Sequence, residues 1–182
     1  MKNHKLKTYI KKQLNYSPLQ TIAPEPFYNG YEMKISDLTF EEVKVVMREL
    51  SKPSTWITIS NIFETCFRMP EKDFYEGRVL DYFKARNYIV KTFNRLIETE
   101  IKLLSSLQDL DSAIWEQAGG KRLNRHGAVL SINQLGKIYG IYPFDLKDKK
   151  YQEILLLLTI EKEQREIQKK YDKLKSNLKP KK

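Results

Sequence analysis

The chain has 182 residues, of which 41% are hydrophobic and 31% are charged, and its formal net charge is +10. This apolar content excludes an intrinsically disordered protein, and the length suits one ordinary domain with extended ends. The basic excess lies at the two ends, because residues 1–12 hold +5 and residues 169–182 hold +6, which leaves −1 for residues 13–168. Attraction to nucleic acid is therefore expected from the ends rather than from the body.

The N-terminal residues predict an arm rather than a folded element. Residues 13–36 contain Pro18, Pro24 and Pro26 and show little periodicity, and each proline disfavours helix at the residue before it. We expect residues 1–36 to form an extended, basic, proline-containing arm. Tyr28, Tyr31 and Met33 are candidates to hold it against the body. A small hairpin within residues 19–36, or around residues 128–130, stays open.

The segment 37–165 is predicted to be one helical domain. Thr39 and Glu42 form a capping box, and the apolar residues that follow at spacings of three and four predict a helix that ends before Pro53. A second amphipathic segment runs from Trp56 to Phe67 and ends before Pro70.

Two longer helices are predicted further along. Apolar residues at helical spacing extend over residues 78–107 and indicate a central helix. A second capping box at residues 131–134 predicts a helix that stops at Gly140, and a last long helix begins near Lys149. Residues 166–182 are expected to be its charged end and a lysine-rich tail. The predicted fold is mostly α, a helical bundle with one long central helix, a long C-terminal helix and extended basic ends. No internal repeat is apparent.

The stretch WEQAGGKRLN, residues 115–124, contains paired glycines followed by Lys121 and Arg122. A Walker phosphate loop needs a glycine where Trp115 stands and a hydroxyl residue where Arg122 stands, so that interpretation fails. We interpret the glycines as the end of a short helix that contains Trp115.

Residues for catalysis, a metal or a cofactor are scarce. Cys66 is the single cysteine and lies among apolar neighbours, which predicts a buried, unreactive thiol. His4 and His126 are the two histidines and are expected in a tail and a loop, so a shared metal site is not expected. We predict a non-enzymatic protein without cofactor or metal.

The sequence also lacks membrane signals. Its first dozen residues are not followed by an apolar core, and the longest apolar run, Ile154–Leu158, has five residues. We expect a soluble cytoplasmic protein without membrane contact.

Residues 131–146 (SINQLGKIYGIYPFDL) have a helix-turn-helix cadence, which keeps nucleic-acid binding open as an alternative. Against it, the recognition segment would contain Pro143 and two aspartates. The lysines of the two ends are candidates for non-specific phosphate contacts. They are Lys2, Lys5, Lys7, Lys11, Lys12, Lys169, Lys170, Lys173, Lys175, Lys179, Lys181 and Lys182.

The C-terminal third resembles small morphogenesis proteins of tailed bacteriophages, and is most similar to the tail assembly chaperones. The resemblance rests on WEQAGG at residues 115–120, YGIYP at residues 139–143 and YQEILLLL at residues 151–158. The long helix predicted at 78–107 and the lysine-rich ends depart from those chaperones and would suit a head–tail joining or other virion component.

The resemblance implies a non-enzymatic function in the host cytoplasm, with incorporation into the virion as an alternative. The implied partners are tape-measure, tail or connector subunits, and self-association is left open. A chaperone of this kind shields apolar helices of the tape-measure protein, which needs an exposed apolar groove. The candidate residues for this surface are Trp115, Tyr139, Tyr142, Phe144 and Tyr151. The alternative is that these aromatic residues form an ordinary core.

Overall fold

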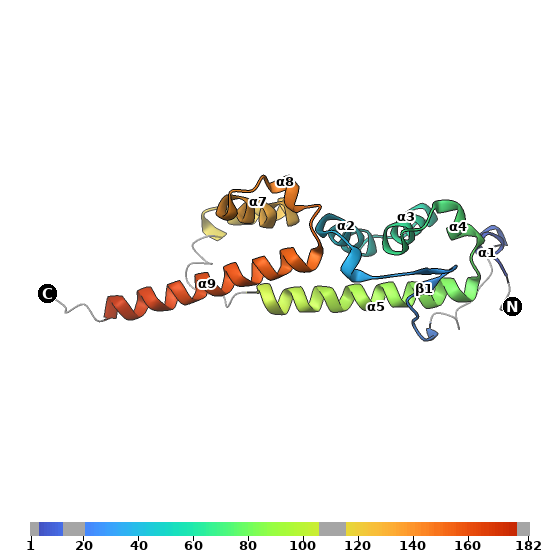
Figure 1. The fold of residues 1–182 in the computed structure, drawn as a ribbon, viewed down its shortest axis with the longest axis horizontal. Coiled ribbons are helices and arrows are strands. Elements are labelled where there is room, and N and C mark those ends of the chain that lie inside the picture. The colour runs from blue at the N-terminus through green and yellow to red at the C-terminus, as the bar shows by residue number, and fades with distance from the viewer. Residues whose placement is uncertain (1–3, 13–20, 106–115, 178–182) are drawn as a thin grey trace. The chain divides into compact units, whose positions relative to one another are not determined.

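The computed structural model describes residues 4–12, 21–105 and 116–177, and most of them are helical (Figure 1). The predicted mostly α fold is therefore confirmed. The chain divides into two compact units, Met1–Glu98 and Thr99–Lys182. This division differs from the predicted single domain over residues 37–165, because it falls within the long central helix.

Unit 1 combines a small hairpin with several helices. In chain order they are α1 (Leu6–Lys12), β1 (Phe27–Tyr28), β2 (Tyr31–Glu32), the 3₁₀ turn η2 (Ile35–Asp37), α2 (Phe40–Leu50), α3 (Trp56–Phe67), α4 (Glu71–Glu76) and α5 (Val79–Leu104). The bounds of α2, α3 and α5 are close to the predicted ones, whereas α1, η2 and α4 are not predicted from the sequence. The last turn of α5 belongs to unit 2.

The predicted capping box at the start of α2 is confirmed. The Thr39 hydroxyl accepts a hydrogen bond from the Glu42 amide, and the Glu42 carboxylate accepts one from the Thr39 amide at 2.8 Å. Arg68 donates to the same carboxylate at 2.7 Å and to the Asp37 carbonyl at 3.1 Å. One arginine thus ties the end of α3 to the start of α2.

The N-terminal residues are part of unit 1 rather than an extended arm, which corrects the prediction. Leu6 and Tyr28 have no exposed surface and Met33 is 3% exposed. Backbone hydrogen bonds join Leu6 to Gly77 and Val79 to His4. The free energy gained by burying these apolar side chains outweighs the tendency of the prolines to keep this segment extended.

Tyr28 is the anchor of this segment. Its ring lies 5.0 Å from the ring of Phe63 and 6.1 Å from that of Phe74, and its hydroxyl donates to the Phe74 carbonyl at 2.5 Å. A Cβ atom at Gly77 would lie 2.3 Å from the Tyr28 hydroxyl oxygen, so only glycine leaves room for the ring. The proposed roles of Tyr28, Tyr31 and Met33 in holding the segment are confirmed, since Tyr31 donates to Asp73 at 2.6 Å.

The hairpin left open for residues 19–36 is present. Strands β1 and β2 are joined through Asn29 and Gly30, which both have positive φ angles of 48° and 86°. Asn-Gly in this conformation is the favoured two-residue hairpin turn.

Unit 2 consists of the end of α5 and a second set of helices. These are the 3₁₀ helix η3 (Gly120–His126), α7 (Ala128–Tyr139), α8 (Pro143–Leu146) and α9 (Tyr151–Asn177). The end of α5 is fixed to α9 by two hydrogen bonds. The Tyr151 hydroxyl donates to Glu100 at 3.2 Å, and Lys162 donates to the Leu103 carbonyl at 2.9 Å.

The predicted start of α7 is wrong and its predicted end is right. The helix begins at Ala128, three residues before the predicted capping box, because Gly127 with φ 46° turns the chain and residues 128–130 extend the helix. A hairpin at 128–130 is therefore excluded. Gly140 ends the helix in the left-handed conformation, with φ 67°.

The order and lengths of the helices in unit 2 match those of part of unit 1, although the sequence shows no repeat. In each unit a 12-residue helix ends at a left-handed residue, a short helix follows, and a helix of 26 or 27 residues completes the set (Figure 1). Corresponding positions lie 72 residues apart, as in Trp56 and Ala128, Arg68 and Gly140, and Val79 and Tyr151.

Gly136 is expected to be essential for the packing of α8 on α7. A Cβ atom at this position would lie 2.6 Å from the Ile141 carbonyl oxygen and 2.9 Å from Pro143. Gly136→Ala is predicted to lower the free energy of unfolding by about 1–3 kcal/mol, measured by urea denaturation followed by circular dichroism. Lys137→Ala on the exposed side of α7 should change it by less than about 0.5 kcal/mol. Equal stability of the two variants would contradict this packing.

Glu42 is expected to make stability depend on acid pH. Burial alone would raise the pKa of Glu42, but hydrogen bonds from Arg68 and Thr39 lower it below its usual value. Because the folded state holds this proton less tightly, the stabilisation is present above the ordinary carboxyl pKa and is lost as pH falls through the lowered one. The Glu42→Gln variant should have a free energy of unfolding about 1 kcal/mol lower near neutral pH. This free energy should also decline less steeply on acidification than that of the unmodified protein. Parallel urea titrations at several pH values measure both effects, and an unchanged decline in the variant would exclude this role.

Candidate protein-binding surface

Five apolar side chains lie exposed where α7 turns into α8, and we call this surface the aromatic corner. Tyr142 is 63% exposed and Ile138 is 51% exposed, and the rings of Tyr142 and Phe144 lie 5.6 Å apart. The complete set is Ile138, Tyr139, Ile141, Tyr142 and Phe144. Contiguous exposed apolar residues of this kind are typical of surfaces that bind another macromolecule.

The backbone explains why these side chains face outward. Gly140 reverses the chain, and the amide of Ile141 donates to the Gly136 carbonyl at 3.0 Å. The close approach at Gly136 places α8 directly against α7, with Pro143 in the first turn of α8. Leu135 and Leu146 fill the space beneath and are 1% and 2% exposed. The corner is therefore a rigid surface above a packed core.

The structure brings together three of the five predicted partner-binding residues. Tyr139, Tyr142 and Phe144 are exposed at the aromatic corner, and the Tyr139 hydroxyl also donates to Glu161 of α9 at 2.9 Å. Tyr151, the first residue of α9, is instead 1% exposed, and burial raises its pKa well above the usual value. Trp115 lies outside the described residues. Ile138 and Ile141 were not predicted, although they flank Tyr139 in the same turn.

Helix α9 carries a second row of exposed apolar residues, which we call the α9 stripe. Its members recur at spacings of three, four and seven, so they share one side of the helix. They are Leu156, Ile160, Ile167, Tyr171 and Leu174, with exposed fractions between 36% and 66%. An amphipathic row of this length is suited to packing against another helix.

The predicted phosphate-contact lysines fall into different environments. Lys5 and Lys7 both bind Glu76, and their hydrogen bonds lower the pKa of Glu76 to about 2. These two lysines thus hold the N-terminal residues to α4. Lys11 and Lys12 are exposed at the end of α1, and Lys169, Lys170, Lys173 and Lys175 are exposed on α9. The remaining candidates, Lys2, Lys179, Lys181 and Lys182, lie outside the described residues.

The glycine pair has the conformation expected at a helix end. Gly119 has φ 89°, and Gly120 begins η3. Lys121 forms an ion pair with Glu116 at 2.9 Å, one turn earlier. The pair therefore turns the chain between two helical segments.

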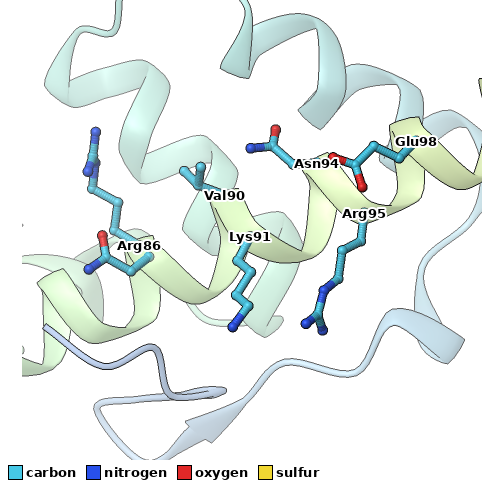
Figure 2. A pocket seen from close by; sticks show the side chains of 7 residues that line it. Arg86, Val90, Lys91, Asn94, Arg95 and Glu98 are labelled. Carbon is cyan, nitrogen blue, oxygen red and sulfur yellow. The ribbon is translucent and has the colours of Figure 1, made fainter. Parts of the chain in front are cut away.

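A hollow of about 500 Å³ along α5 is lined by polar side chains, but they do not converge on a common point (Figure 2). Lys91 and Arg95 point away from the side on which Val90 and Asn94 lie. Asn87, which also lines the hollow, donates to the Ile22 carbonyl at 2.9 Å. Asn87 therefore helps to hold the segment around Ile22 against α5.

The described residues contain no group of three or more His, Cys, Asp or Glu side chains that could hold a metal ion. Within the same residues, no helix combines the length and apolar character needed to cross a bilayer. No protein-family model, curated protein or solved structure matches the chain. The candidate site consequently rests on the geometry of this chain alone.

Cys66 is predicted to be chemically inert in the folded protein. It is 2% exposed, and burial raises the pKa of its thiol to about 12. Since the thiolate is the reactive form, a disulfide-exchange reagent such as Ellman's reagent should react only after denaturation. One thiol per chain should then appear in denaturant, as the single cysteine requires. Rapid reaction of the native protein would contradict the burial of this residue.

Proposed function

We propose that this chain is a non-enzymatic assembly protein of a tailed bacteriophage that acts through helix-mediated contacts with other proteins. The observation that carries the proposal is the aromatic corner, where five large apolar side chains stay exposed above a well-packed core. Exposure of this area to water is unfavourable, and a partner that covers it recovers that free energy. The α9 stripe supplies a second surface of the same kind.

The phage assignment follows from the resemblance of residues 115–158 to tail assembly chaperones. In this proposal the aromatic corner covers apolar helices of the tape-measure protein before the tail tube polymerises around it. A permanent position in the virion, at the head–tail junction, is the alternative form of the same proposal. The two forms differ in whether the chain is present in purified particles.

Nucleic-acid binding through residues 131–146 receives less support from the geometry. Helix α8, which would have to read the major groove, has four residues and contains Asp145. A recognition helix needs several side chains that reach base edges. The aromatic corner also presents apolar rather than cationic side chains.

The proposal predicts that the aromatic corner is needed for a complex with the tape-measure protein of the same phage. Co-expression should yield a soluble complex by size-exclusion chromatography, and Tyr142→Ser with Phe144→Ser should weaken it at least about tenfold. The matched control is Phe27→Ser with Ile57→Ser, which removes similar exposed apolar area from unit 1. Loss of the complex in the control alone, or in neither variant, would reject the proposal.

Binding to DNA can be tested separately through the exposed lysines. Replacing Lys11, Lys12, Lys170, Lys173 and Lys175 by glutamine removes charge without removing the buried Leu6. We expect the unmodified chain to bind DNA weakly, with an affinity that falls steeply as the salt concentration rises. This binding should disappear in the variant. Tight binding that survives these replacements would favour the nucleic-acid alternative.

A further inference from the structure

Helices α7 and α9 enclose a groove that adjoins the aromatic corner and shares Ile138 with it. The groove has a volume of about 530 Å³, and it extends along α9 beyond the part that α7 covers. Its apolar lining comes from both helices and from the end of α5. The residues concerned are Leu104, Leu135, Ile138 and Leu158.

The rim of this groove is strongly basic. Five lysines and arginines and two glutamates line it, which leaves a net charge of +3. After Leu158, most of the basic residues recur at spacings of three and four. They therefore lie on the same side of α9 as Leu158, which is the side that lines the groove. They are Lys162, Arg165, Lys169, Lys170 and Lys173. An apolar lining with a cationic rim is complementary to an apolar ligand with acidic flanks.

The matching helix order allows positions of the groove to be compared with positions 72 residues earlier in unit 1. Five of the thirteen lining positions, at residues 134, 135, 138, 161 and 165, have counterparts there that are buried. These counterparts are Ile62, Phe63, Cys66, Ile89 and Phe93, none of them more than 6% exposed. Helix α2 packs against α3 in that unit, with Phe40, Val43 and Val46 buried. In unit 1, therefore, an amphipathic helix covers apolar surface of α3, the helix that corresponds in order and length to α7.

We propose that the groove between α7 and α9 binds an amphipathic helix of a partner protein, whose acidic flank faces the basic rim. The apolar side of that helix covers the leucine and isoleucine lining, and its carboxylates pair with residues such as Arg165 and Lys173. The proposal rests on the function proposed above only in taking the chain to be a protein-binding module. It concerns an adjoining surface, which shares only Ile138 with the aromatic corner, and a stated chemistry of the partner.

A helix fits the groove better than a nucleic acid does. An anionic polymer would pair with the lysines but would leave the exposed parts of Leu104, Ile138 and Leu158 uncovered. A helix of eleven residues, the length of α2, spans about 16 Å and presents two to three apolar turns. The charge of the rim then selects among helices by their flanking residues.

The test uses two synthetic helical peptides of about 18 residues, or roughly 27 Å. Both carry leucines on one side, and their flanks carry glutamates in one peptide and lysines in the other. In fluorescence anisotropy titrations of the full chain, the glutamate peptide should bind at least about tenfold more tightly than the lysine peptide. Equal binding of the two peptides, or binding of neither, would overturn the proposal.

Charge-reversal variants of the rim test whether the peptide binds in the groove. Arg165→Glu with Lys173→Glu should weaken binding of the glutamate peptide at least about tenfold and should reduce the preference over the lysine peptide. The matched control, Lys137→Glu with Lys175→Glu, makes the same change in net charge on residues that do not line the groove. It should leave the affinity within about threefold. An equal loss in both double variants would show a general charge effect and reject the groove.

Two further outcomes are decisive. Displacement of the glutamate peptide by a single-stranded oligonucleotide with higher affinity would assign the rim to nucleic acid and overturn the proposal. Retention of peptide binding by the Tyr142→Ser and Phe144→Ser variant is expected, because those residues do not line the groove. Since the peptide assay contains no phage protein, it can succeed even if the tape-measure complex does not form, and the reverse is equally possible.

Discussion

A left-handed residue at the end of a twelve-residue helix determines much of the rest of this structure. In unit 1 that residue is Arg68, with φ 55°, and in unit 2 it is Gly140, with φ 67°. A non-glycine residue in this conformation costs roughly 1–2 kcal/mol. Arg68 offsets this through its ion pair with Glu42 and its hydrogen bond to the Asp37 carbonyl. The same side chain fixes α2 to α3, whereas the glycine of unit 2 offers no side chain for such a link.

The two units also differ in how far their large apolar side chains are covered. In unit 1, Tyr28, Phe63, Phe67 and Phe74 are buried. In unit 2, Tyr142 and Phe144 remain exposed, and the groove beside α9 has a basic rim. In the proposed function, unit 2 is the half of the chain that presents its exposed apolar surface to partners.

The sequence predicted the helices well, because their apolar periodicity and caps are local features. The capping box at Thr39, the stop at Gly140 and the start of the last helix near residue 149 all depend on a few neighbouring residues. The matching helix order of the two units is not predicted from the sequence, because the two segments share few residues. Between residues 56–104 and 128–176 the same residue occurs at only two corresponding positions, Asn61 with Asn133 and Asp73 with Asp145. The N-terminal segment was mistaken for an arm because Tyr28 is buried by residues far along the chain. The candidate surface was predicted in part, since sequence spacing does not distinguish the buried Tyr151 from the exposed Tyr142.

Hydrogen–deuterium exchange of the full chain, with and without the proposed tape-measure partner, tests the central claim most directly. If unit 2 is the partner-binding half, amides of α7, α8 and α9 should exchange more slowly in the complex, and amides of α2 and α3 should be unchanged. Protection confined to α2 and α3, or no protection in either unit, would contradict this account.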